Sequence, residues 1–217
     1  MVKGKYIYLK IIRRENYRYN DWENINNEKY GVNEVSEIVV LSGSPSILSR
    51  SERVLKYLGS ILEERKFTVS YISVCDVPQG DLYEAKFDSP AVKRIVSLLE
   101  NAQAVVIGSP VYKASYSGIL KSLIDLLPQD ILESKPVLPV MTGGSIAHLL
   151  AIEYTLKPLL ATLKGKNTQG IFYLDSQIDR NATPPIIDKE LVARTNKQLN
   201  YLIAEVNKQK SLQSSAL

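Results

Sequence analysis

From Glu37 onward the chain alternates short apolar runs with longer amphipathic segments. The first run, residues 38–42 (IVVLS), is continuously apolar and ends at a Gly-Ser-Pro turn, which is typical of a strand buried on both faces of a parallel sheet. Residues 51–64 follow, with apolar residues at helical spacing. Because this alternation repeats with short connections, the sequence predicts a parallel sheet covered by helices on both faces.

The later segments of the chain alternate in the same way. The predicted strands are residues 38–42, 67–74, 104–109, 136–142 and 168–174, and the predicted helices are residues 51–64, 90–101, 117–127, 146–163 and 187–208. Pro139 argues against a central position for the fourth strand, since proline donates no ladder hydrogen bond. The order and lengths of the segments favour a flavodoxin-like doubly wound α/β fold with five strands in the order 2-1-3-4-5.

Residues 1–36 differ from the rest of the chain. They contain Trp22, the only tryptophan, together with five of the 13 tyrosines, and show no clear period. We expect a poorly ordered N-terminal extension over 1–36 and one flavodoxin-like domain over 37–217. An arm that docks on the domain, or a start codon placed too far upstream, are the alternatives.

Composition excludes several classes of function. With only Cys75 and His148, the chain has neither a disulfide framework nor the ligands of a structural zinc site, and we expect no bound metal. There is no apolar run of the roughly 20 residues that span a bilayer and no signal peptide, so we expect a cytoplasmic protein without membrane contact. The net charge of +4 is spread without a basic block, which argues against nucleic acid and suits a small phosphate-bearing ligand.

The predicted fold also locates the ligand. In open parallel sheets, ligands bind beyond the carboxyl ends of the strands, where the strand order reverses. That rule selects three loops: residues 42–51, 109–117 and 142–148. We therefore expect the chemistry of this protein in those three loops.

The first loop, SGSPSILSRS, has the composition of a phosphate cradle. Ser44, Ser49 and Ser51 supply hydroxyl groups, and the helix that follows offers free N–H groups and the positive end of its dipole. Arg50 adds a charge-assisted contact. The loop matches neither the Walker A pattern nor GxGxxG, and by itself it is equally consistent with an ordinary capped turn.

The second and third loops have features that suit a planar ring. The second, GSPVYKASYSG, offers the flat faces of Tyr112 and Tyr116 and the cation of Lys113, although both tyrosines are also consistent with packing at a subunit edge. The third, TGGSIAH, has a double glycine that permits close approach of a ligand to the backbone. We predict that His148, on the first turn of the next helix, is neutral and has a supporting role.

Taken together, these loops resemble those of the NADPH-dependent FMN reductase family, and within it the subgroup that serves bacterial alkanesulfonate utilisation. The matching stretches are LSGSPSILSRS (41–51), FDSPAVK (87–93), SPVYKASYSGILKSLIDLLP (109–128), LPVMTGGSIAHLLAIEYTLKPLLATLK (138–164) and DSQ (175–177). The resemblance extends over about residues 37–205 and leaves residues 1–36 without a counterpart.

The resemblance implies that NADPH reduces FMN by hydride transfer from the nicotinamide C4 to the flavin N5, and that a partner monooxygenase uses the reduced flavin in organosulfur utilisation. No side chain is then a catalytic residue, because the hydride passes between the cofactors. The implied cofactor-binding residues are Ser44, Ser49, Arg50 and Ser51 at the phosphate, Pro110, Val111, Tyr112 and Lys113 along the ring, and Thr142, Gly143, Gly144 and Ser145 flanking it. Many relatives have arginine directly after Ser-Pro, where this chain has Ser46.

Two further properties follow from the resemblance. In the alkanesulfonate subgroup an extra tyrosine, here Tyr116, creates a π-helical turn after the second loop that is tied to oligomer contacts and flavin release. We expect a homo-oligomer, dimer or tetramer, with the apolar helix 119–127 at its interface. The alternative function on this scaffold is a tightly FMN-bound NAD(P)H quinone or azo-dye reductase. An electron carrier of the flavodoxin kind is opposed by the basic pI of about 8.9.

Overall fold

The computed structural model describes residues 37–214, so the extension predicted for residues 1–36 lies outside the described residues. The strands are β1 (Ile38–Ser42), β2 (Val69–Ser73), β3 (Ala104–Pro110), β4 (Pro136–Gly143), β5 (Lys166–Asn167) and β6 (Ile171–Leu174). The α-helices are α3 (Arg50–Glu64), α4 (Gln79–Tyr83), α5 (Pro90–Asn101), α6 (Gly118–Ile124), α7 (Lys157–Thr162) and α8 (Lys189–Ser214). No helix among these residues is both long and apolar enough to cross a bilayer.

All the strand pairs are parallel, and the order is β2-β1-β3-β4, with β5 and β6 both pairing with the far side of β4. This confirms the predicted flavodoxin-like order 2-1-3-4-5. The prediction of one continuous last strand was wrong, because two short strands share the fifth position.

The split in the fifth position has a physical cause in Pro139. β5 pairs with residues 136–137 of β4 and β6 with residues 140–143, so the break lies opposite Pro139. A proline offers no N–H to a neighbouring strand. Gly170, at φ +80°, carries the chain around the proline ring, and a Cβ there would lie 2.9 Å from the Pro139 Cγ. Pro139 is thus central after all, and the neighbouring strand is interrupted to accommodate it.

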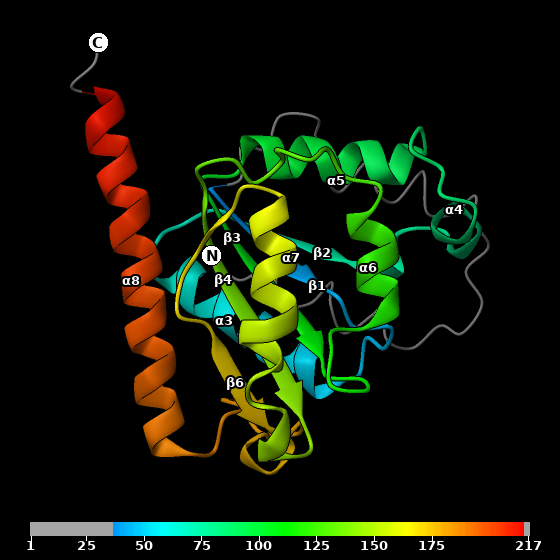
Figure 1. Cartoon of the computed structure of the whole chain (residues 1–217). Helices are drawn as coiled ribbons and strands as arrows, with labels where there is room; N and C mark the ends of the chain where they lie inside the picture. The colour runs from blue at the N-terminus through cyan, green and yellow to red at the C-terminus, as the bar shows by residue number, and fades with distance from the viewer. Residues whose placement is uncertain (1–36, 215–217) are drawn as a thin grey trace, which may run out of the picture. The chain divides into compact units, whose positions relative to one another are not determined.

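Helices lie on both faces of the sheet (Figure 1), and each face packs with its helices in an apolar layer. One face packs against α5, α6 and α7, and the other against α3 and α8. Because side chains alternate along a strand, successive residues of β1 enter different layers. Val39 and Leu41 face the first layer, and Ile38 and Val40 face the second.

The helices that follow the three loops begin differently. Ser49 and Ser117 cap α3 and α6, each accepting a hydrogen bond from a backbone N–H of the first turn. The predicted helix 146–163 is instead composite: a 3₁₀ turn at Ile146–His148, a π-helical turn at Ile152–Leu156, and then α7. His148 therefore lies on a 3₁₀ turn rather than on the first turn of an α-helix.

Candidate functional site

The first and second loops are joined by hydrogen bonds at the carboxyl ends of β1 and β3. The N–H of Gly43 donates to the carbonyl of Gly108 at 2.7 Å, and the Ser117 hydroxyl donates to the Gly43 carbonyl at 2.5 Å. The Ser117 N–H donates to the Ser109 hydroxyl at 2.9 Å. A Cβ at Gly43 would lie 2.8 Å from the Leu120 Cβ, so only glycine lets α6 approach this closely.

The third loop is joined to both of the others. The N–H of Val111 donates to the Thr142 carbonyl at 2.8 Å. The hydroxyl groups of Ser51 and Thr142, both buried, form a short hydrogen bond across the edge of the sheet. The structure thus brings together the three loops predicted from the strand order.

The first loop is held by its serines. Ser44 is fully buried, and its hydroxyl lies 2.8 Å from that of Ser49 and accepts a hydrogen bond from the Ser46 N–H. Ser49 accepts from the Glu52 N–H as the N-cap of α3. These side chains therefore shape the loop. The backbone of the loop, the exposed Ser46 and Arg50 face outward and are suited to meet a ligand.

Arg50 is the first residue of α3 and lies beside a carboxylate that follows β6. Its Nη1 is 3.7 Å from Oδ2 of Asp175, and the two side chains are 38% and 40% exposed. Its Nε is buried and has no hydrogen-bond partner among residues 37–214. An arginine with an unused N–H at a helix N-terminus is suited to an anion that accepts from both.

The second loop is a tight turn that presents Tyr112. The backbones of Tyr112 and Ser115 exchange two hydrogen bonds, and the residues between them, Lys113 and Ala114, have φ angles of 51° and 62°. Residues other than glycine rarely adopt such backbone angles, so the turn is conformationally constrained. The Tyr112 side chain is exposed beyond it, whereas Pro110 and Val111 are at least partly buried at the end of β3.

The third loop passes from the core to the surface within four residues. Thr142 and Gly143 are buried at the end of β4, whereas Gly144 and Ser145 are exposed. The Ser145 hydroxyl caps the 3₁₀ turn by accepting from the Ala147 N–H at 3.2 Å. The exposed backbone at Gly144 and the Tyr112 ring provide solvent-facing groups from different loops at one edge of the sheet.

The prediction of a π-helical bulge at Tyr116 was wrong. Tyr116 lies before α6, packs partly buried against the core, and is followed by an ordinary α-helix from Gly118. The π-helical turn occurs after the third loop, where it places Tyr154 on the surface with its side chain 75% exposed. The Ser117 cap fixes the start of α6, and a serine before this helix is a local signal that the sequence contains.

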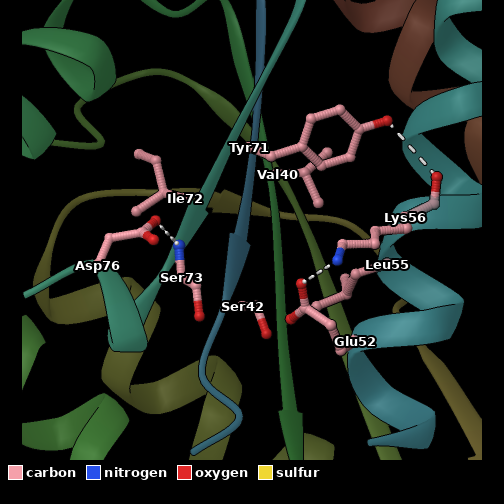
Figure 2. A pocket seen from close by; sticks show the side chains of 9 residues that line it. All are labelled: Val40, Ser42, Glu52, Leu55, Lys56, Tyr71, Ile72, Ser73 and Asp76. Carbon is pink, nitrogen blue, oxygen red and sulfur yellow. Dashed lines mark hydrogen bonds and ion pairs between the residues drawn. The ribbon is translucent and has the colours of Figure 1, made fainter. Parts of the chain in front are cut away.

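Outside the three loops, a small cavity lies between α3 and β2, the strand that pairs with β1 (Figure 2). Its volume is about 90 Å³, below the roughly 300 Å³ at which pockets for drug-sized ligands begin. Glu52 is buried there, with one carboxylate oxygen 3.3 Å from the Lys56 Nζ and the other without a hydrogen-bond partner in the described part of the chain. The cavity is therefore too small for a flavin, and the three-loop edge remains the candidate site.

Burial shifts two titrating groups behind the first loop. Desolvation raises the pKa of the Cys75 thiol, which lies 3.5 Å from the Ser44 carbonyl as a donor. Desolvation likewise raises the pKa of Asp76, although the hydrogen bond from the Ser73 N–H opposes this. The Cys75 thiol thus supports the first loop as a hydrogen-bond donor.

Three residues of the site were missed in the sequence. Ser117 joins the second loop to the first, Ser109 closes the second loop, and Asp175 adds a carboxylate after β6. Asp175 follows a predicted strand directly, so its position at this edge was available. The rule of the strand-order reversal did not include it, because it selects the ends of the central strands.

Comparisons with known proteins agree with this geometry. A family model described as NADPH-dependent FMN reductase matches residues 36–179. An FMN reductase (NADPH) of Pseudomonas putida is 49% identical over 65% of this chain and 72% of its own length, and one of Escherichia coli is 44% identical over 65% and 74%. A solved apo structure of an NADH:FMN oxidoreductase aligns with a TM-score of 0.69 and 31% identity, over 77% of this chain and 88% of that one. The chain belongs to the NADPH-dependent FMN reductase family.

Proposed function

We propose that the three joined loops bind FMN while NADPH reduces it, and that reduced FMN then leaves as the product. As a member of this family, the protein is an oxidoreductase that uses FMN and NADPH. The observation that carries the proposal is the meeting of the three loops at the reversal of strand order, with the part-exposed guanidinium of Arg50 at the N-terminus of α3.

The residues at this edge fit the phosphate of FMN. Arg50 supplies the cation, and the first turn of α3 supplies N–H groups that have no acceptor within the helix. Ser44 and Ser49 hold each other at 2.8 Å, which fixes the loop before any ligand arrives. We assign the phosphate to this loop and retain Ser51 as a buried support, because its hydroxyl is used by Thr142.

The second and third loops suit the ring. Tyr112 gives a flat exposed face, and the turn through Lys113 fixes that face relative to β3. The backbone at Gly144, in the third loop, is also exposed. When bound, FMN supplies the electron-accepting ring and NADPH the hydride, so the protein has to orient the two rings and needs no acid or base for that transfer.

The fate of the product is a finer proposal. The stretch from residue 109 to residue 164 resembles the alkanesulfonate subgroup, and on that basis we propose a flavin-dependent monooxygenase in organosulfur utilisation as the recipient of reduced FMN. Growth of a strain lacking this protein on an alkanesulfonate as sulfur source tests the assignment. Normal growth on the sulfonate would contradict it.

We also propose that the chain forms a homodimer or homotetramer. The apolar residues Leu120, Leu123 and Ile124 of α6 are buried within the chain itself, so the helix predicted at the interface offers little free apolar surface. Exposed apolar side chains occur instead around the π-helical turn, at Leu150 and Tyr154. Sedimentation velocity of the full chain measures the state directly, and a monomer at micromolar concentration would contradict the proposal.

The decisive experiment is NADPH oxidation with and without added FMN, on protein whose visible flavin absorbance has first been recorded. Colourless protein that oxidises NADPH only when FMN is added supports FMN as a substrate. Yellow protein that reduces a quinone or an azo dye without added flavin would replace this proposal with the tight-flavin reductase. Riboflavin in place of FMN measures how far the phosphate contributes to KM.

A further inference from the structure

The ion pair between Arg50 and Asp175 brings a negative charge to the edge where the phosphate of FMN is assigned. Nη1 of Arg50 and Oδ2 of Asp175 are 3.7 Å apart, which is longer than a hydrogen bond. The two groups are therefore held by charge attraction, and both side chains are exposed enough to separate at small cost. Arg50 keeps its buried Nε unpartnered within the described residues.

Asp175 also lies close to the third loop. A Cβ built on Gly144 would be 3.7 Å from the same Oδ2 atom. The carboxylate is thus positioned between the start of α3 and the exposed glycine of the third loop. A ligand that extends from the first loop to the third loop has to pass this charge.

The position is electrostatically favourable for any anion. The N-terminus of the 15-residue helix α3 attracts negative charge through its dipole and its free N–H groups. The Asp175 carboxylate lies beside the guanidinium of the first residue of this helix, so its negative charge offsets part of the attraction that a phosphate would receive here. It also occupies the guanidinium that the phosphate needs.

We propose that Asp175 is a positioning residue that competes with the phosphate of FMN for Arg50 and so weakens flavin binding. This inference rests on the proposed function, and it gives FMN the character of an exchanging substrate. Asp175 acts through Arg50 and through its own charge, and it takes no part in the chemistry of the rings.

The test is a comparison of FMN and riboflavin affinities. The dissociation constants of both are measured by quenching of flavin fluorescence for the wild type and for Asp175→Asn. We expect Asp175→Asn to tighten FMN about three- to tenfold, the size of one half-exposed charge pair acting on a phosphate, and to leave riboflavin unchanged. In steady state the KM for FMN falls and kcat does not rise, because product release is slowed.

Two further variants separate this role from a structural one. Asp130→Asn makes the same charge change at an exposed residue in the connection to β4, at the opposite edge of the sheet, and should leave the FMN to riboflavin ratio unaltered. Arg50→Met should weaken FMN, and in that background Asp175→Asn should give a smaller gain. Thermal unfolding shows whether each variant is folded.

The outcomes are distinct. An Asp175→Asn protein that binds FMN as the wild type does, or more weakly, overturns the inference and leaves the proposed function intact. Equal gains for FMN and riboflavin also overturn it, since the phosphate would then not be involved. Wild-type protein that binds neither flavin refutes the proposed function itself.

Discussion

Ser117 connects the first two loops of the site, and its replacement by alanine is the sharpest test of how they are held. The side chain is 1% exposed. Its hydroxyl donates to the Gly43 carbonyl at 2.5 Å and accepts from the Leu120 N–H at 3.2 Å as the N-cap of α6. Alanine removes both hydrogen bonds without adding volume.

The magnitude follows from those two bonds. Loss of a serine N-cap costs about 1 kcal/mol, and a buried carbonyl left without its donor costs about 1–3 kcal/mol. We expect Ser117→Ala to lower the free energy of unfolding by about 2–4 kcal/mol. Because the first loop loses a support, the KM for FMN should rise as well.

Urea unfolding followed by circular dichroism measures the change, and Ser122→Ala is the matched control. The Ser122 hydroxyl donates to the Gly118 carbonyl at 3.2 Å on the exposed side of the same helix, so its loss should cost less than about 0.5 kcal/mol. If Ser117→Ala is no less stable than Ser122→Ala, the assigned role of the hydroxyl is refuted. A stable Ser117→Ala protein with an unchanged KM would refute the link to the site.

Two predictions concern the frame behind the site. The Thr195 hydroxyl donates to the Leu191 carbonyl at 2.7 Å, so the buried Tyr173 hydroxyl donates to Thr195 at 2.9 Å, and burial raises the pKa of Tyr173. Thr195→Val should lower the free energy of unfolding by about 1–3 kcal/mol. Urea unfolding of the double variant with Tyr173→Phe tests this, because losses of stability that simply add would contradict the hydrogen bond between the two side chains. The Lys210 ammonium at 2.6 Å, with the Thr68 N–H, holds the pKa of Glu37 below its ordinary value of 4.5. The contribution of ionised Glu37 to the free energy of unfolding is therefore fully present above the pKa of Glu37 in the unfolded chain. It is lost as the pH falls through the lower pKa of Glu37 in the folded protein. Glu37→Gln should have a lower free energy of unfolding than the wild type at neutral pH, and the two proteins should be equally stable in strong acid. A difference in stability that persists in strong acid would disprove the assignment.

The proposal that reduced FMN leaves as a product can be related to two features of the first loop. The first loop is shaped by Ser44 and Ser49 through bonds between serines, so its form does not depend on a ligand. The cation beside it already has a partner in Asp175. Because the charge of Asp175 offsets part of the charge of Arg50, this loop gains less from binding a phosphate than a loop with a free arginine, which suits the proposed release of the flavin.

The sequence predicted the sheet and the three loops that form the candidate site. Apolar runs such as residues 38–42 and helical spacing in residues 51–64 are local signals, and short crossovers admit only a few arrangements of parallel strands. The ends of those strands then selected the three loops. The break between β5 and β6 was not predicted, because the effect of Pro139 on a neighbouring strand depends on which strand lies beside it.

Only the tertiary structure decided how the side chains of the site are used. It placed Asp175 against Arg50 over a separation of 125 residues, assigned the hydroxyl of Ser51 to Thr142, and moved the π-helical turn from Tyr116 to residues 152–156. The Arg50–Asp175 pair and the Ser51–Thr142 hydrogen bond both join elements that are distant in sequence. Local propensity fixes where a helix or strand forms, whereas partners for charges and hydroxyls are fixed by packing, which no single segment encodes.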